Sequence, residues 1–176
     1  MVTANEFSHV VKISEVGNHS RNLRLSADEA ARHALMARFD LAALYNLEAE
    51  ISLKHEADAV IATGRFTASL AQFCIATHDP VPAKLDEAIH IQFIAEPTSN
   101  GEVELELAPE DCDTMFHDGQ TIDLGEAVAQ SMCLALNPYP RSPEAEKILK
   151  AAGVKSEEDV APVGALAGLK DLLAKK

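Results

Sequence analysis

Aromatic residues, cysteines and basic side chains are all scarce in this sequence. Aromatic residues make up 5% of the 176 residues, and tryptophan is absent. The three cysteines, Cys74, Cys112 and Cys133, are widely spaced and form no C-x-x-C pair. This spacing argues against both a disulfide framework and a cysteine-ligated zinc site.

Long apolar runs are missing as well. No stretch approaches the roughly 20 apolar residues that cross a membrane, and residues 1–7 lack the charged start and apolar stretch of a signal peptide. We therefore expect a cytoplasmic protein without a membrane segment. Apolar residues still make up 47% of the chain, which is enough for one folded domain.

The motifs of common enzyme classes do not occur. There is no Walker phosphate loop, no G-x-G-x-x-G dinucleotide motif and no G-x-S-x-G nucleophile elbow. None of the seven histidines has a helical i, i+4 partner together with a matching third metal ligand. His78 and Asp79 are adjacent, but neighbouring side chains of an extended chain point apart. We expect no catalytic residue, cofactor or metal, and we interpret Cys74 as a buried, unreactive thiol.

The negative charge is concentrated in one region. The formal net charge is −13, and residues 84–126 contribute −11 of it, with 12 acidic residues and only Lys84 as a basic one. A surface that neutralises phosphates needs clustered Lys and Arg, so this composition disfavours DNA and broad RNA binding. A concentrated acidic surface instead attracts basic proteins or cations. The alternative interpretation is that the charge only keeps the protein soluble.

Alternation of apolar and polar residues predicts several strands, most with one apolar face, as in an antiparallel sheet. They cover 7–13, 20–25, 44–54, 59–76, 89–93 and 103–107. A change of parity after Leu70 predicts a β-bulge near Ala71 or Gln72. A turn is expected at 79–82 and an acidic loop at 108–120. The predicted fold is a single α+β domain with a mainly antiparallel twisted sheet and helices packed on it.

Helices are predicted in both halves of the chain. Ser26 and Glu29 form a capping-box pattern that opens a helix ending near Phe39. A short helix at 144–151 ends at Gly153, and an amphipathic helix follows at 163–173. We assign 1–143 to the main domain and 144–176 to a helical extension. The sequence leaves open whether the final helix docks on the domain or moves.

The best-marked helix covers 123–136. Asp123 can cap its N-terminus, and Glu126 can reach back to complete a capping box. Few polar residues interrupt its apolar surface, so most of this helix should be buried under the sheet. Asn137 and Pro138 end it, because the residue before a proline avoids the α region.

A rigid turn follows this helix. Pro138 and Pro140 restrict the backbone, so Tyr139 and Arg141 should be held side by side. Tyr and Arg anchor many interfaces and also stack on RNA bases. The alternative is a structural corner in which Tyr139 packs on the sheet and Arg141 pairs with a carboxylate such as Glu126.

The acidic region supplies the other candidate binding residues. The predicted strand at 103–107 shows water a row of three carboxylates, and the loop after it adds more. The candidates are Glu102, Glu104, Glu106, Asp111 and Asp113.

Two separate segments resemble the signature of the YceD-like family, which is named for accumulation of the large ribosomal RNA subunit. The first is Cys74-Ile-Ala-Thr-His-Asp-Pro-Val81, and the second joins Asp123-Leu-Gly-Glu126 to Leu134-Ala-Leu-Asn-Pro-Tyr-Pro-Arg141. The matching motif positions are Cys74, Asp123, Gly125, Glu126, Asn137, Pro138 and Pro140. Thr77 replaces the second cysteine that some members carry, and Asn137 replaces a common Asp.

The resemblance implies a non-catalytic role in large ribosomal subunit biogenesis. Genes of the family often neighbour that of a small ribosomal protein of this subunit. We therefore expect the acidic region 84–126 to bind a basic ribosomal protein or a pre-50S particle. Direct contact of Tyr139 and Arg141 with ribosomal RNA is one alternative, and a general protein-interaction module without a ribosomal role is another.

Overall fold

The computed structural model describes residues 6–96 and 113–154. The strand predicted at 103–107, the final helix predicted at 163–173, and the candidates Glu102, Glu104, Glu106 and Asp111 lie outside these described residues. Cys112 lies outside them too.

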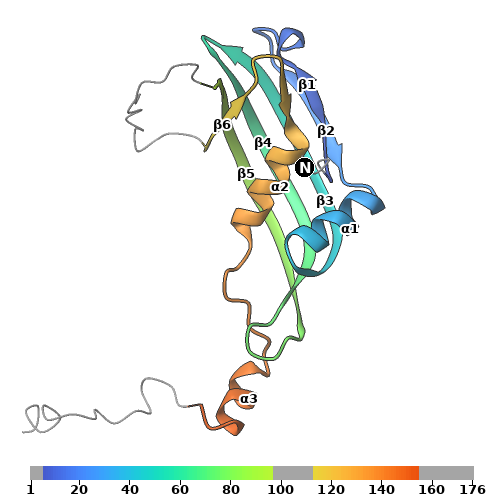
Figure 1. Ribbon diagram of the computed structural model, residues 1–176, viewed down its shortest axis with the longest axis vertical. Coiled ribbons are helices and arrows are strands. Elements are labelled where there is room, and N and C mark those ends of the chain that lie inside the picture. The colour runs from blue at the N-terminus through green and yellow to red at the C-terminus, as the bar shows by residue number, and fades with distance from the viewer. Residues whose placement is uncertain (1–5, 97–112, 155–176) are drawn as a thin grey trace, which may run out of the picture.

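The core of the fold is a five-stranded sheet in the order β2-β3-β4-β5-β6. Three long strands, β3, β4 and β5, run antiparallel, β2 extends them on one side, and the short β6 pairs parallel with β5 (Figure 1). The strands are β1 (Val10–Lys12), β2 (Arg21–Ser26), β3 (Leu41–Glu56), β4 (Ala59–Phe73), β5 (Pro80–Ala95), β6 (Asp113–His117) and β7 (Thr121–Asp123). The helices are α1 (Glu29–Arg38), α2 (Leu124–Ala135) and α3 (Ala145–Ala151), with a 3-10 turn at Ile13–Glu15. The predicted α+β fold with a mainly antiparallel sheet is confirmed.

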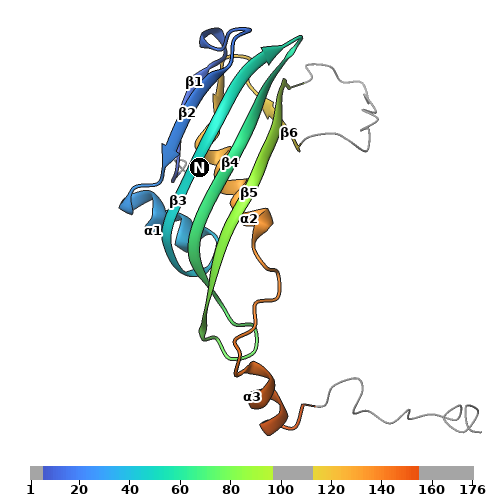
Figure 2. The same ribbon diagram turned by 180° about the vertical axis from the view of Figure 1, so that it is seen from behind.

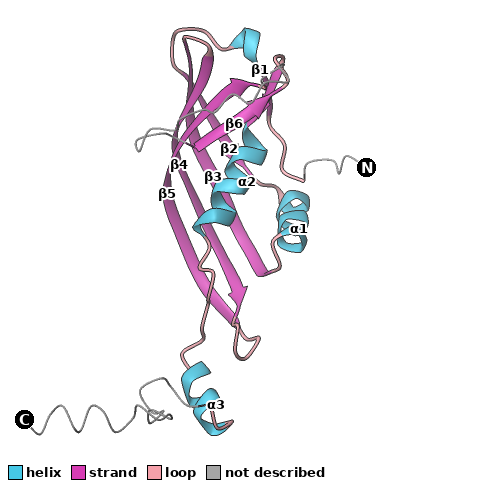
Figure 3. Cartoon of the chain, turned by 60° about the vertical axis from the view of Figure 1, so that its left-hand side comes forward, coloured by secondary structure: helices cyan, strands magenta, loops and turns pink. Residues whose placement is uncertain are grey.

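Within residues 6–96 and 113–154, one face of the sheet is covered by other elements and the other face is bare. α1, α2 and the small β1–β7 sheet lie on the covered face, whereas the view from behind shows β3, β4 and β5 uncovered (Figures 1 and 2). The side view places both helices on the same side of the sheet (Figure 3). In β3 the covered face buries Leu47, Ala49, Ile51 and Leu53, as the alternation predicts. One-sided burial of this kind is typical of antiparallel sheets.

α1 begins two residues later than predicted, because its cap is Asp28 rather than Ser26. Ser26 is the last residue of β2 and pairs with Glu48 of β3. The cap is Asp28, whose Oδ1 accepts a hydrogen bond from the Ala31 amide at 2.8 Å. A carboxylate at this position satisfies a free amide of the first helical turn, so the helix starts at Glu29.

The parity change near Leu70 has its origin in the neighbouring strand. The register shifts lie in β3, between Leu41 and Ala43 and between Leu44 and Asn46, while β4 pairs with β5 without interruption. The irregularity lies at the predicted level, because Leu41 pairs with Gln72 and Ala43 with Ala71, but the extra residue is Ala42 in β3 rather than a residue of β4. The sequence of β4 locates the irregularity along the sheet, but it does not show which strand carries the extra residue.

β5 starts at Pro80, earlier than the predicted strand at 89–93, because the prolines that suggested a turn are accommodated at the edge of the sheet. Pro80 and Pro82 lie within the strand, opposite Phe73 and Ala71, and the turn before them covers 74–79. β6 pairs only with the part of β5 at 91–95, so the proline end of β5 has no second neighbour among the described residues. Proline is tolerated at such an edge position because its missing N–H is not needed there.

The expected loop at 108–120 contains β6 and leads into β7. Both strands are too short to show a period in the sequence. The short helix near 144–151 is present as α3, and Gly153 follows its end with φ of 82°. No helix in the described part of the chain is long and apolar enough to cross a membrane.

Candidate functional site

The first turn of α2 holds the N-terminal segment of the chain. The Asp123 carboxylate accepts hydrogen bonds from the amides of Gly125 at 3.0 Å and Glu126 at 3.2 Å, so it caps the helix as predicted. The same carboxylate accepts from the His9 amide at 2.9 Å and from Ser8 Oγ at 2.6 Å. One side chain therefore both starts the helix and fixes the segment leading into β1.

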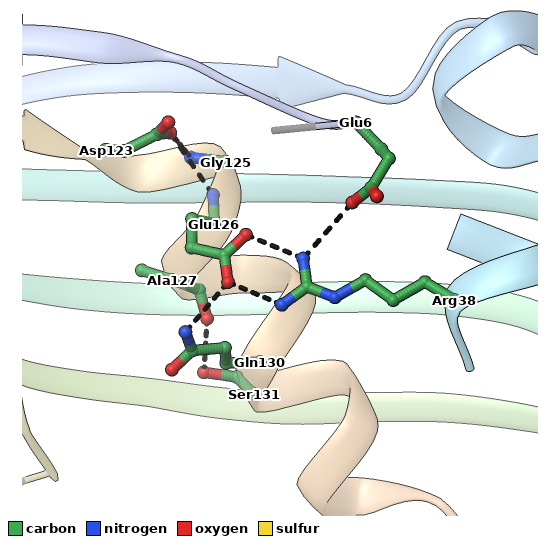
Figure 4. A network of polar contacts seen from close by, with 8 residues as sticks. All are labelled: Glu6, Arg38, Asp123, Gly125, Glu126, Ala127, Gln130 and Ser131. Atoms are coloured by element: carbon green, nitrogen blue, oxygen red, sulfur yellow. Dashed lines mark hydrogen bonds and ion pairs between the residues drawn. The ribbon is translucent and has the colours of Figure 1, made fainter. Parts of the chain in front are cut away.

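Glu126 turns toward α1 rather than back to the cap. Its two carboxylate oxygens accept hydrogen bonds from both terminal nitrogens of Arg38, at 2.8 and 2.7 Å (Figure 4). Gln130 donates to the same carboxylate at 2.8 Å, and Glu6 lies 3.3 Å from Arg38. The hydrogen bond from Arg38 is the main cause that lowers the pKa of Glu126. The predicted capping box and the predicted pairing of Glu126 with Arg141 are both wrong.

Gly125 is required by close packing. A Cβ at this position would collide with the carbonyl oxygen of Phe7. The absent side chain lets the helix lie directly on the backbone of residues 7–9. We call Asp123, Gly125, Glu126 and Arg38 the clasp. The Asp-Leu-Gly-Glu motif is thus accounted for by packing.

The second motif region joins two segments that are far apart in the sequence. The Ser142 amide donates to Cys74 Sγ at 3.3 Å, and the Ile75 amide donates to the Pro140 carbonyl at 3.0 Å. Gln72 Nε2 donates to the Asn137 carbonyl at 2.9 Å. We call residues 74–79 and 137–142 the corner. It lies at the opposite end of the sheet from β1 (Figure 1).

Cys74 is a structural part of this corner. Its side chain is 2% exposed. Hydrogen bonds from Thr77 and from the Ser142 amide lower the pKa of the thiol from its ordinary 9.0 to about 6, although burial acts in the opposite direction. Cys74 and Cys133 are both free thiols, and Cys133 is exposed.

The corner presents apolar side chains to solvent. Tyr139 is 72% exposed, so the alternative in which it packs on the sheet is wrong. Ile75 and Leu134 are also largely exposed, and Arg141 is exposed beside them. Pro140, by contrast, is buried and anchors the turn, while the Tyr139 amide donates to Asn137 Oδ1 at 2.9 Å.

A shallow groove of about 440 Å³ runs through the corner. It is lined by Phe73, Ile75, Leu134, Leu136, Pro138 and Pro140, with polar residues at its rim. No pattern in the sequence marks Ile75 and Leu134 as surface residues. Both belong to apolar patterns, and only the packing of the neighbouring elements shows that they point outward.

The described acidic residues of region 84–126 divide into two groups. Four of the seven serve internal contacts: Asp86 pairs with Arg65, Asp118 accepts from two backbone amides, and Asp123 and Glu126 belong to the clasp. Within the described residues the side chains of Glu87, Glu96 and Asp113 have no such partner.

These three carboxylates lie along the β5–β6 edge of the sheet. Glu87 is in β5, Glu96 follows it with its amide bonded to the His117 carbonyl at 3.2 Å, and Asp113 opens β6. We call Glu87, Glu96 and Asp113 the acidic edge. The candidates Glu102, Glu104, Glu106 and Asp111 lie outside the described residues, so the structure does not assign them to this edge.

A second groove, of about 360 Å³, lies between this edge and α2. Its apolar lining comes from Phe66, Ile89, Leu134 and Ala135, and its polar lining includes Glu87 and Asp113. Among the described residues, no three His, Cys, Asp or Glu side chains gather closely enough to hold a metal ion.

No known protein family, no curated protein and no solved structure matches this sequence.

Proposed function

We propose that this protein is a non-catalytic factor in large ribosomal subunit biogenesis that binds a basic ribosomal protein, alone or within a pre-50S particle, through its acidic edge. The observation that carries the proposal is that three carboxylates without a partner among the described residues, Glu87, Glu96 and Asp113, lie along one edge of the sheet. The ribosomal setting rests on the resemblance of the clasp and corner motifs to the YceD-like family.

The distribution of paired and unpaired acids favours binding over simple solubility. Carboxylates that serve the fold are neutralised by Arg38, Arg65 or backbone amides. The remaining ones, Glu87, Glu96 and Asp113, lie along the β5–β6 edge, and Lys84 is the only basic residue in the sequence of region 84–126. A surface of a single sign raises the association rate of an oppositely charged partner.

The residues that resemble catalytic groups have structural roles in this fold. Asp123 and Glu126 hold segments together, and the Cys74 sulfur accepts a hydrogen bond within a closed corner. We therefore propose binding without catalysis.

Pull-down of purified basic ribosomal proteins at low and high salt tests the proposal. We expect retention at about 50 mM salt and release near 500 mM, where charges about 5 Å apart or more are screened. Glu87→Gln, Glu96→Gln and Asp113→Asn together should weaken retention. Glu48→Gln, Glu56→Gln and Glu146→Gln together change the net charge equally at other exposed positions and should not. Equal effects of both triple variants would reject the acidic edge.

Direct contact with ribosomal RNA is a second candidate, favoured by the exposed Tyr139 and Arg141 on a rigid turn. Binding of purified ribosomal RNA that is lost with Tyr139→Ala plus Arg141→Ala, but kept when the acidic edge is neutralised, would establish it. Co-sedimentation with pre-50S particles, followed by cross-linking, would identify the component in contact.

A further inference from the structure

Among the residues that the structure describes, part of strand β5 has no neighbouring strand on its outer side and forms an open edge. β5 pairs with β4 along its whole length, but β6 covers only 91–95. Pro80 and Pro82 show which backbone groups face outward, because a proline in a paired strand occupies a position whose missing N–H points away from its neighbour. Along a strand, the amides of successive residues point alternately toward and away from the neighbouring strand. The pairing of β5 with β4 is uninterrupted, so the amides of Lys84, Asp86 and Ala88 also point away from β4. No strand among the described residues pairs with these amides.

The open edge lies beside the groove between β5 and α2. Ala88 lines this groove together with the unpaired carboxylates Glu87 and Asp113, and Leu134 stands on its α2 side with 79% of its surface exposed. A strand added to β5 would point every second side chain over this groove. A lysine or arginine there can lay its apolar stem along Leu134 and reach the two carboxylates with its charged end.

Because the open edge of β5 lies next to this groove and its carboxylates, we infer that the partner binds with an extended, lysine- or arginine-rich segment. This segment pairs as an additional strand with the part of β5 that precedes its pairing with β6 at 91–95. The inference rests on the proposed function and names the form in which the basic partner is bound. An unpaired strand edge is a template for backbone pairing, which supplies affinity. The flanking carboxylates select a basic segment, because an acidic one would be repelled.

Amide hydrogen exchange by NMR tests the inference on the full-length protein. The probe is a peptide of about eight residues with alternating lysine and valine, a usual strand length. Its control alternates lysine and proline, which keeps the charge but cannot pair as a strand. We expect the lysine–valine peptide to slow exchange of the Lys84, Asp86 and Ala88 amides by about ten-fold or more. The control should bind about ten-fold more weakly and slow none of them.

Variants of Ala88 provide an independent readout. Ala88→Pro removes one outward amide at an edge position, as Pro80 and Pro82 already do, and should weaken binding of the lysine–valine peptide about ten-fold. Ala88→Val keeps the amide and should therefore retain much more binding than Ala88→Pro, although its side chain also lines the groove. Thermal unfolding of both variants checks that the sheet is intact, and the exchange measurement on the unaltered protein needs neither variant.

The possible failures are distinguishable. Equal binding of both peptides without slowed exchange would overturn strand addition and leave the acidic edge as a purely electrostatic surface. Amides that are already protected in the free protein would show that the chain's own segment at 97–112 occupies the edge, and would also overturn the inference. Absence of binding by either peptide would overturn both the inference and the proposed function.

Discussion

At the scale of single residues, the polar side chains of the motifs act as connectors. Asp123 joins α2 to the segment before β1 through four hydrogen bonds, and the Cys74 sulfur joins the turn after β4 to the turn after α2. The contacts of Asp123 with Ser8 and His9 span 115 and 114 residues of sequence, and the contact of Cys74 with Ser142 spans 68. Loss of one side chain therefore affects two elements.

Replacement of Asp123 should destabilise the protein more than loss of an ordinary helix cap. A lost cap costs about 1–2 kcal/mol, and Asp123→Ala also leaves the His9 amide without its acceptor. We expect a loss of about 2–3 kcal/mol, measured by urea unfolding. Asp123→Asn keeps an acceptor oxygen and should cost clearly less. Equal losses for the two variants would contradict the proposed connection.

Cys74 should make stability depend on pH. Its pKa falls from 9.0 to about 6 on folding, so between these values the folded protein holds a thiolate and the unfolded chain holds a proton. Unfolding then takes up a proton, and stability rises with pH through this window. The stability difference between the unaltered protein and Cys74→Ser, measured under reducing conditions, should widen from pH 6 to pH 9. Cys133→Ser, which removes an exposed thiol, is the control, and a gap that stays constant would contradict the prediction.

At the scale of elements, the close approach of α2 to the N-terminal segment determines how the covered face of the sheet is assembled. α2 buries Leu124, Ala127, Val128 and Met132 and lies next to β1 (Figure 1). Gly125 allows this approach, because a Cβ at its position would collide with the backbone of Phe7. The second half of the helix is more open, because Cys133 and Leu134 face solvent.

Adding one methyl group at Gly125 should therefore be costly. Gly125→Ala forces the backbone of residues 7–9 or the helix to move, and overpacking of this kind costs about 1–3 kcal/mol or more. This exceeds the gain in helix propensity of about 1 kcal/mol. Gly17→Ala, where a Cβ meets only one atom at 3.9 Å, should change stability by about 0.5 kcal/mol or less. Thermal unfolding of both variants compares them, and a stable Gly125→Ala protein would refute the packing argument.

At the scale of the whole molecule, polar pairs on the covered face tie distant parts of the chain into one body. Arg38 in α1 and Glu126 in α2 are 88 residues apart in sequence and form a two-point ion pair. The covered face therefore carries the connecting contacts, whereas no described helix lies on the opposite face of the sheet (Figure 2).

The coupling between Arg38 and Glu126 can be measured directly. Their side chains are 32% and 16% exposed, so the pair is partly shielded from water. In a double-mutant cycle with Arg38→Ala and Glu126→Ala we expect a coupling free energy of about 1–2 kcal/mol. The exposed pair of Arg24 and Glu50, at 2.7 Å, is the control and should give about 0.5 kcal/mol or less. Equal coupling in the two pairs would show that the clasp has no special role.

Local patterns in the sequence determined much of this fold. The alternation in β3 identified its buried face, and Asp123 marked the start of α2, because both signals depend on neighbours within a few residues. The regional charge of 84–126 and the proline-braced turn were equally readable. Each of these features follows from residues close together in the chain.

Only the tertiary structure decided which residues meet. The partner of Glu126, the location of the register shifts in β3, the open edge of β5 and the exposure of Leu134 all depend on elements far apart in sequence. The local pattern of a single sequence does not show which distant residues come into contact, because the packing of the neighbouring strands and helices determines these contacts. For the same reason, only the structure distinguishes the carboxylates that form internal contacts from those that lie without such a partner along the β5–β6 edge.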